Sequence, residues 1–257
     1  MKFMESGVKL YTVREYTKNL EDFAKTLERI ADIGYRVVQV SGTCAYEPEW
    51  LKGQLDRLGL KCAITHYNID RIAFDTDKVV DEHKQFGCEY IGIGCMKNAL
   101  NNGMEDYKEF YRLYKPAGKR IAELGCKLMY HNHAFEFART GKGGPIYLEK
   151  MAEDFSPEEL GFTLDTYWVQ AGGGNPVQWI KKLAGRVDCV HLKDMAYENG
   201  QQRMAPVYEG NIDFDSILEA CEAAGTKYLL VEQDDCYGED PFECLKKSYE
   251  YLKSLGL

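Results

Sequence analysis

The stretch Ala31-Asp32-Ile33-Gly34-Tyr35-Arg36-Val37-Val38-Gln39-Val40 decides the fold, because its pattern recurs along the chain. Apolar residues at helical spacing lead up to Gly34, and a short apolar run follows it. Glycine is favoured just after a helix because the left-handed backbone conformation costs it no steric energy. A short apolar run after such a turn is typical of a strand that is buried on both faces. The stretch therefore predicts the end of a helix joined to a buried strand.

The same junction occurs six more times, at Gly59, Gly87, Gly125, Gly161, Gly185 and Gly225. With a first strand at Gly7 to Val13, these junctions give eight strands, each followed by a helical segment. Eight such units in 257 residues fit a closed (β/α)8 barrel. No glycine-rich dinucleotide fingerprint follows the first strand, which disfavours an open doubly wound sheet. We therefore predict an α/β fold, with a single (β/α)8 TIM-barrel domain over residues 1–257.

Composition narrows the class of protein. Lys and Arg number 32 and Asp and Glu 41, so the net charge of −9 disfavours a nucleic-acid partner, which basic residues would bind. No apolar run approaches the ~18 residues of a membrane span. The nine cysteines are scattered and form no C-x-x-C pair, which argues against a disulfide framework or a structural zinc site. Met1 to Gly7 lacks the apolar core of a signal peptide, so we expect a cytoplasmic protein.

Polar side chains gather at the carboxyl ends of the predicted strands, where the active sites of such barrels lie. Four of the five histidines are among them. The residues of interest are His66, His131, His133, Glu136, Asp165, Trp168, His191, Lys193, Asp194, Glu232 and Asp234. Nitrogen and oxygen ligands without a thiolate suit Mn, Mg, Co, Fe or Zn.

Strand alternation indicates which of these side chains face the barrel interior. Asp165, His191 and Glu232 lie on the inward faces of successive strands, so we predict that they hold one divalent metal ion. His66, His133 and Lys193 are candidate substrate contacts. Trp168 either stacks on a sugar ring or packs in the ordinary way. In the segment from Gly172 to Pro176, Asn175 is expected to cap a helix that begins at Pro176.

Several of these motifs occur together and in order in one known family. They are Tyr130-His131-Asn132-His133 with Glu136-Phe137, Leu164-Asp165-Thr166-Tyr167-Trp168, His191-Leu192-Lys193-Asp194, Glu209-Gly210 with Ile212-Asp213, and Val231-Glu232-Gln233-Asp234. In these motifs the chain resembles the sugar phosphate isomerase/epimerase family, with its xylose isomerase-like barrel. The resemblance covers essentially the whole chain. It implies one divalent metal held by a Glu, an Asp, a His and a Glu from strands five to eight, the last three being Asp165, His191 and Glu232.

The chain departs from this pattern at the fifth strand. Many relatives have Glu-Asn-His there, whereas this chain has His131-Asn132-His133. Either His131 takes the ligand position or Glu136 reaches back to it. A third carboxylate suits a hard cation and favours Glu136, whereas face alternation favours His131. In epimerase relatives two metal-bound glutamates move the substrate proton, so His131, His133 or His66 would have to replace the first.

The resemblance and the residues together predict a metal-dependent sugar or sugar phosphate isomerase or epimerase. Glu232 would remove a proton from the carbon next to a carbonyl, and the metal would stabilise the enediolate that forms. His131 or His133 would act as the acid, and Lys193 would donate a hydrogen bond to the substrate. The alternative is a dehydratase or lyase on keto-sugars, keto-inositols or 3-keto-glycosides, in which the same enolate expels a β-substituent. A non-catalytic sugar-binding barrel and a repair endonuclease are less favoured. The expected partner is a small sugar or polyol derivative, and the oligomeric state, a homo-oligomer included, stays open.

Overall fold

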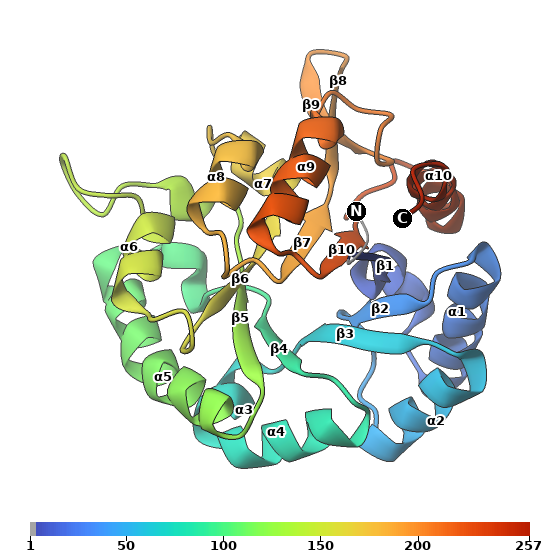
Figure 1. The fold of residues 1–257 in the computed structure, drawn as a ribbon, viewed down its shortest axis with the longest axis horizontal. Helices are drawn as coiled ribbons and strands as arrows, with labels where there is room; N and C mark the ends of the chain where they lie inside the picture. The colour runs from blue at the N-terminus through green and yellow to red at the C-terminus, as the bar shows by residue number, and fades with distance from the viewer. Residues whose placement is uncertain (1–3) are drawn as a thin grey trace.

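Eight parallel strands close into a barrel in the computed structural model, which describes residues 4–257 (Figure 1). Around the barrel the strands follow the order β1-β10-β7-β6-β5-β4-β3-β2, and every neighbouring pair is parallel. The strands are β1 Glu5–Lys9, β2 Val37–Val40, β3 Lys61–His66, β4 Tyr90–Ile93, β5 Lys127–His131, β6 Gly161–Asp165, β7 Cys189–Leu192 and β10 Tyr228–Val231. The predicted (β/α)8 barrel is confirmed.

Helices follow each strand and surround the barrel in Figure 1. They are η1 Leu10–Tyr16, α1 Leu20–Ile33, α2 Pro48–Leu58, α3 Ile69–Phe74, α4 Thr76–Gln85, η2 Lys97–Leu100, α5 Met104–Glu123, η3 Phe135–Phe137, α6 Tyr147–Asp154, α7 Thr166–Ala171, α8 Pro176–Lys182, α9 Phe214–Ala224 and α10 Pro241–Ser254. Asn175 caps α8 as predicted, since its side chain accepts a hydrogen bond from the Gln178 N–H and Pro176 is the first helical residue.

The junction glycines behave as predicted at six of the seven positions, where φ is positive, for example +62° at Gly59 and +79° at Gly225. The prediction is wrong at Gly161, which is the first residue of β6. Glycine is needed there for space, because a Cβ would lie 2.5 Å from the Met129 Sδ atom. The first strand is also shorter than predicted. It ends at Lys9, and the buried run that follows, including Leu10 and Val13, forms the turns of η1 instead.

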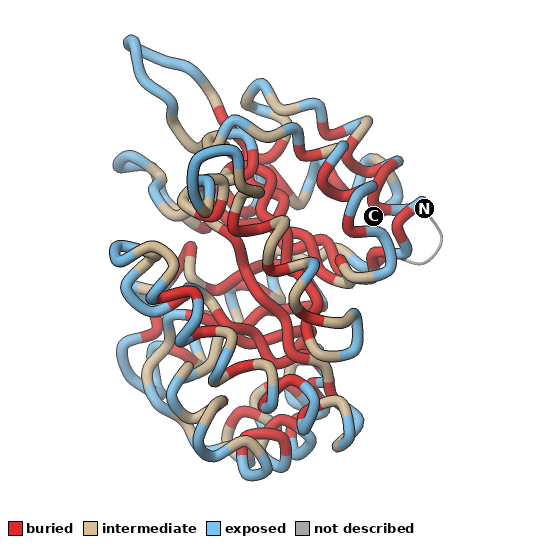
Figure 2. The backbone as a smooth tube through the Cα atoms, turned by 90° about the vertical axis from the view of Figure 1, so that its left-hand side faces the viewer, coloured by how far each residue is buried: buried red, intermediate tan, exposed pale blue. Residues whose placement is uncertain are grey.

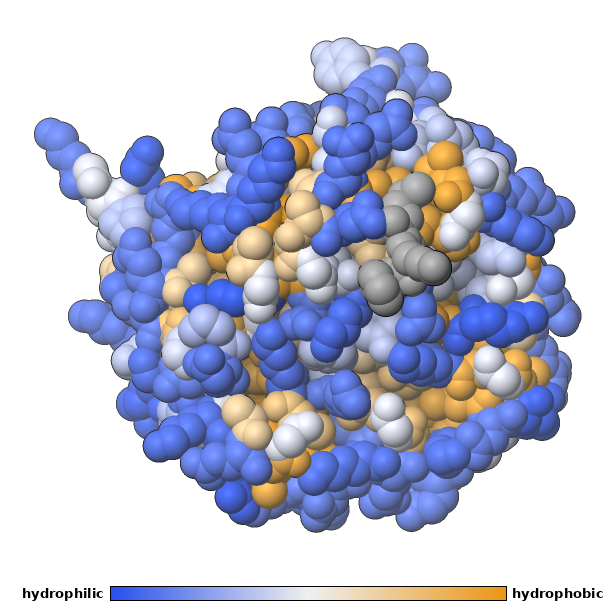
Figure 3. Space-filling model, viewed as in Figure 1, coloured by the Kyte–Doolittle hydropathy of each residue, from blue (hydrophilic) through white to orange (hydrophobic). Residues whose placement is uncertain are grey.

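The hydrophobic core has two layers, one inside the barrel and a larger one between the barrel and the helices. The strands form a continuous buried centre in Figure 2, with exposed residues on the outer helices and loops. The inner layer consists of Val37, Ala63, Ile64, Tyr90, Met129, Cys189, Tyr228 and Leu230. Hydrophilic side chains cover most of the face seen in Figure 3, with separate apolar patches between them. No helix in residues 4–257 is long and apolar enough to cross a membrane.

A hairpin that the sequence reading missed extends from the end of β7. Its strands, β8 Asp194–Glu198 and β9 Gln201–Ala205, pair antiparallel and project beyond the helices at the top of Figure 1. Asn199 and Gly200 connect them with φ of +51° and +80°. Asn-Gly with two positive φ angles is the favoured two-residue hairpin turn, so this dipeptide was an available signal. Residues 1–3 of the segment that was examined for a signal peptide lie outside the described residues.

Candidate metal centre and substrate cavity

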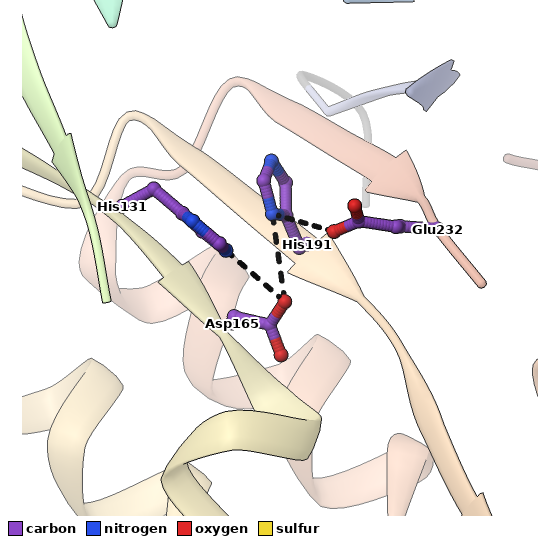
Figure 4. A group of neighbouring side chains, drawn as sticks. All are labelled: His131, Asp165, His191 and Glu232. Carbon is purple, nitrogen blue, oxygen red and sulfur yellow. Dashed lines mark hydrogen bonds and ion pairs between the residues drawn. The ribbon is translucent and has the colours of Figure 1, made fainter. Parts of the chain in front are cut away.

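The side chains of four residues converge above the inner core layer: His131, Asp165, His191 and Glu232. Each residue follows an inward-facing residue of the same strand by two positions, so it also faces inward. His131 follows Met129, His191 follows Cys189, and Glu232 follows Leu230 in this way, and Asp165 occupies the same level on β6. One ligand atom from each residue lies within 4.8 Å of the others, and all four residues are buried (Figure 4). The parallel register places Asp165 directly beside His191. Alternation along the strands therefore accounts for the convergence.

One ring nitrogen of each imidazole is held by an acceptor from the barrel wall, and the other nitrogen faces the carboxylates. Nδ1 of His131 lies 3.0 Å from the Gly94 carbonyl oxygen, which can only accept, so Nδ1 carries the proton and Nε2 faces Asp165 Oδ2 at 3.2 Å. Nε2 of His191 donates likewise to Gln39 Oε1 at 2.7 Å. Its Nδ1 then faces Asp165 Oδ2 at 3.6 Å and Glu232 Oε2 at 3.1 Å.

This arrangement fits a bound cation. The buried Nδ1 atom of His191 and Oε2 atom of Glu232 face each other at 3.1 Å and make no hydrogen bond, while Lys9 pairs with the other oxygen of Glu232. Burial lowers the pKa of His131 well below its ordinary value, and the nearby Lys9 charge lowers it further, so its imidazole is neutral. The lone pair of the neutral His131 imidazole faces the Asp165 carboxylate at 3.2 Å, and a cation between the two would turn this repulsive contact into a shared coordination. Two nitrogen and two oxygen donors form a ligand set that suits divalent transition metals.

Glu136, which the sequence reading favoured as the ligand from the fifth strand, lies outside this group. Its Oε1 atom accepts a hydrogen bond from the Tyr130 hydroxyl at 2.6 Å, and its Oε2 atom accepts one from the His133 N–H at 2.8 Å. Burial raises the pKa of Glu136 to about 7. The physical reason for its position is local: Glu136 belongs to η3, beyond the end of β5, and its two oxygens hold that turn against the strand.

Two buried lysines surround the carboxylates. Lys193 Nζ lies 2.5 Å from Asp234 Oδ2, 3.7 Å from Asp165 Oδ2 and 3.6 Å from Glu232 Oε2. Lys9 Nζ lies 2.6 Å from Glu232 Oε1. Burial alone would raise the pKa of Glu232, but the charges of Lys193 and Lys9 outweigh it and hold this pKa well below the ordinary value. Glu232 is therefore ionised at neutral pH.

The sequence reading missed Lys9 and Gln39. Both follow the alternation that identified the other residues, since Lys9 is two residues beyond Gly7 on β1 and Gln39 two beyond Val37 on β2. Alternation was considered only for the fifth to eighth strands, so the first two strands were left out.

A cavity of about 350 Å³ opens beside the four converging residues, and His66, His133 and Asp234 help to line it. Burial lowers the pKa of His133 to about 4, so its imidazole is neutral. Burial and the charge of Glu232 raise the pKa of Asp234 to about 6. Trp168 does not line this cavity. Its ring packs against His133, with centroids 5.7 Å apart, and below Lys193 Nζ at 5.0 Å. That placement favours packing over sugar stacking.

Two of the sequence motifs contact each other through Asp194, the last residue of the His191-Leu192-Lys193-Asp194 motif, and the backbone of Gly210 and Ile212. The buried Asp194 carboxylate accepts hydrogen bonds from four backbone N–H groups, those of Met195, Tyr208, Gly210 and Ile212. A Cβ on Gly210 would lie 2.4 Å from Asp194 Oδ1, so this close approach requires glycine. The carboxylate thereby fixes the loop after β9 to the residue that follows Lys193.

The barrel with acids and imidazoles at its mouth has known relatives. Residues 27–255 match the xylose isomerase-like TIM barrel family, and the chain belongs to it. An inosose dehydratase of Geobacillus kaustophilus is 23% identical over 198 residues, which span 68% of this chain and 62% of that protein. The inosose dehydratase of Geobacillus thermodenitrificans is 24% identical over 90% of this chain and 89% of its own length. In structure, a sugar phosphate isomerase/epimerase from Parabacteroides distasonis superposes with a TM-score of 0.80 at 22% identity, covering 98% and 94% of the two chains.

Proposed function

We propose that this chain is a single-domain, metal-dependent enzyme that moves a proton at the carbon next to a carbonyl group of a sugar or polyol derivative. The observation that carries the proposal is the group of four buried side chains, two imidazoles and two carboxylates, at the mouth of the barrel. We propose that His131, Asp165, His191 and Glu232 hold one divalent cation, with His131 in the position that a glutamate has in many relatives. The net charge of −9 supports a small molecule over a nucleic acid as the partner.

A divalent cation held there supplies a Lewis acid for the carbonyl and hydroxyl oxygens of the substrate. Glu232 is the proposed base, because it is ionised and lines the cavity. Lys193 and Lys9 keep it ionised and offer positive charge where negative charge develops on the substrate.

His133 is the proposed hydrogen-bond donor to the substrate oxygen on which negative charge develops. It lines the cavity, and because burial lowers its pKa to about 4, its imidazole is neutral at pH 7 and can donate an N–H hydrogen bond without giving up the proton. His131 is less suited to proton transfer, because one of its ring nitrogens is bonded to Gly94 and the other faces Asp165. His66 also lines the cavity and serves as a substrate contact.

The proposed overall reaction is isomerisation or epimerisation, in which the proton returns to the substrate. The second candidate is elimination, in which the same anion expels a β-substituent. The similarity to inosose dehydratases over 90% of the chain supports this alternative. We also propose a reducing, cytoplasmic setting, which the nine free thiols support.

The test is solvent deuterium exchange. Metal-loaded protein is incubated in D2O with a panel of keto-sugars and keto-inositols, and products are analysed by mass and by NMR. We expect deuterium at the carbon next to the carbonyl, and loss of this exchange in Glu232→Gln. The exposed Glu239→Gln is the matched control and should exchange like the wild type. An isomer of unchanged formula supports the first reaction, and a product lighter by one water supports elimination. Absence of exchange across the panel would contradict both.

A further inference from the structure

A second cavity, of about 420 Å³, adjoins the one beside the candidate metal centre. It lies between residues 40–46, which begin at the last residue of β2, and residues 66–71, which run from the last residue of β3 into α3. The two cavities share Ser41, His66 and Tyr67 in their walls. Each alone reaches the lower end of the roughly 300–1,000 Å³ range of small-molecule sites. We infer that the second cavity is a distal subsite for an uncharged second ring, so that the substrate is a glycoside rather than a free or phosphorylated sugar.

The two cavities differ in the side chains that line them. This difference assigns the reaction to the first cavity and the binding of a second ring to the second cavity. Glu232, Asp234 and His133 line only the first cavity. The second has no acid among its described lining residues and offers two aromatic rings, Tyr46 and Tyr67, together with short polar side chains. Aromatic faces with a few hydrogen-bonding groups suit a sugar or aryl ring. This assignment rests on the proposed function, because the reacting carbon is placed in the first cavity.

Charge balance argues against a phosphate in the second cavity. Arg71 is the only cation among its described lining residues. Its guanidinium makes two hydrogen bonds of 2.9 Å to Glu82 and one of 2.9 Å to Asp75. It also donates to the Tyr67 hydroxyl at 2.7 Å. Two carboxylates therefore already neutralise the one positive charge, and a phosphate would have to displace them.

The described side chains at the first cavity offer no unpaired cation for a phosphate either. Lys9 lies against Glu232, and the Lys193 ammonium beside the cavity lies against Asp234. The proposed metal ion is then the one unpaired positive charge among the described groups, and it is placed at the reacting carbonyl, so the second cavity favours a neutral ring. The shared residues Ser41, His66 and Tyr67 mark the place where the glycosidic bond would cross from one cavity to the other.

The experiment compares two unreactive glycosides that differ only in the group attached to the anomeric oxygen, together with one phosphorylated sugar. Dissociation constants of methyl β-D-glucopyranoside, phenyl β-D-glucopyranoside and glucose 6-phosphate are measured by calorimetry or NMR with the metal-loaded protein. Thr43→Trp and Ala45→Trp each fill the second cavity from a loop position. Lys142→Trp, at an exposed loop position far from residues 40–46 in sequence, is the control.

We expect the wild type and Lys142→Trp to bind the phenyl glycoside about tenfold tighter than the methyl glycoside. In Thr43→Trp and Ala45→Trp the ratio should fall to about one, with methyl glycoside binding unchanged. A ratio near one in the wild type, a ratio that survives in both tryptophan variants, or tighter binding of glucose 6-phosphate than of the methyl glycoside would overturn the inference. Because binding of these ligands needs no proton transfer, loss of deuterium exchange with the ratio intact would reject the proposed reaction alone.

Discussion

We expect Asp194→Asn to lower the free energy of unfolding far more than an exposed change from carboxylate to amide does. Each carboxylate oxygen of Asp194 accepts two backbone N–H groups: Oδ1 those of Met195 and Ile212, and Oδ2 those of Tyr208 and Gly210. In either orientation, the asparagine amide points its NH2 group at two of these donors. Two hydrogen bonds to a buried carboxylate are then lost and two N–H groups are left without acceptors.

The size of the effect follows from this count. A hydrogen bond to a charged group contributes about 1.5–3 kcal/mol, so two of them amount to about 3–6 kcal/mol. That is a large part of the roughly 5–15 kcal/mol by which a typical domain is stable. The change should also loosen the loop after β9 and, through Lys193, weaken substrate binding.

The assay is equilibrium unfolding in urea of metal-free protein. Asp213→Asn is the matched control, because Asp213 is an exposed helix cap on the same segment and asparagine caps helices about as well as aspartate. We expect the control to lie within about 0.5 kcal/mol of the wild type. If Asp194→Asn were as stable as the control, the four hydrogen bonds would not be what fixes this loop.

Three further predictions concern charge and metal. Dialysis against a chelator should abolish deuterium exchange, and added Mn²⁺ should restore it; full exchange by the stripped protein would argue against the metal. Lys9→Met should destabilise metal-free protein by about 3 kcal/mol in urea unfolding, because Glu232 loses the closer of its two lysine partners. Burial lowers the pKa of His83 from 6.5 to about 4, so protonation favours the unfolded chain as pH falls below 6.5. Between pH 7 and 5, His83→Gln should therefore lose about 2 kcal/mol less unfolding free energy than the wild type, and equal losses would refute this.

The barrel was predictable because its determinants are local. Each glycine junction, with the apolar run that follows it, lies within about ten consecutive residues. Alternation along a strand predicts which side chains face inward. The same rule placed Asp165, His191 and Glu232 at one level, and it would also have found Lys9 and Gln39. The Asn199-Gly200 hairpin was equally local and was overlooked.

Other features depend on partners distant in the fold or on competition between neighbours, which a sequence pattern does not reveal. Glu136 stays outside the group of four buried side chains because the Tyr130 hydroxyl and the His133 N–H hold both of its oxygens. The strand-like run after Lys9 forms η1, because β1 pairs with β10 only as far as Val8 and with β2 only as far as Lys9. Lys193 was predicted as a substrate contact from its place at a strand end, but its pairing with three carboxylates, on β6 and just after β10, depends on residues distant in sequence.

The central claim is that His131 completes the metal site in place of a glutamate. A crystal structure of the protein soaked with Mn²⁺, with anomalous diffraction recorded at the manganese edge, tests it directly. The account predicts one peak bonded to His131 Nε2, His191 Nδ1, Asp165 and Glu232, with Glu136 still accepting from Tyr130 and His133. A peak coordinated by Glu136 without His131, or no peak among these four residues, would contradict it.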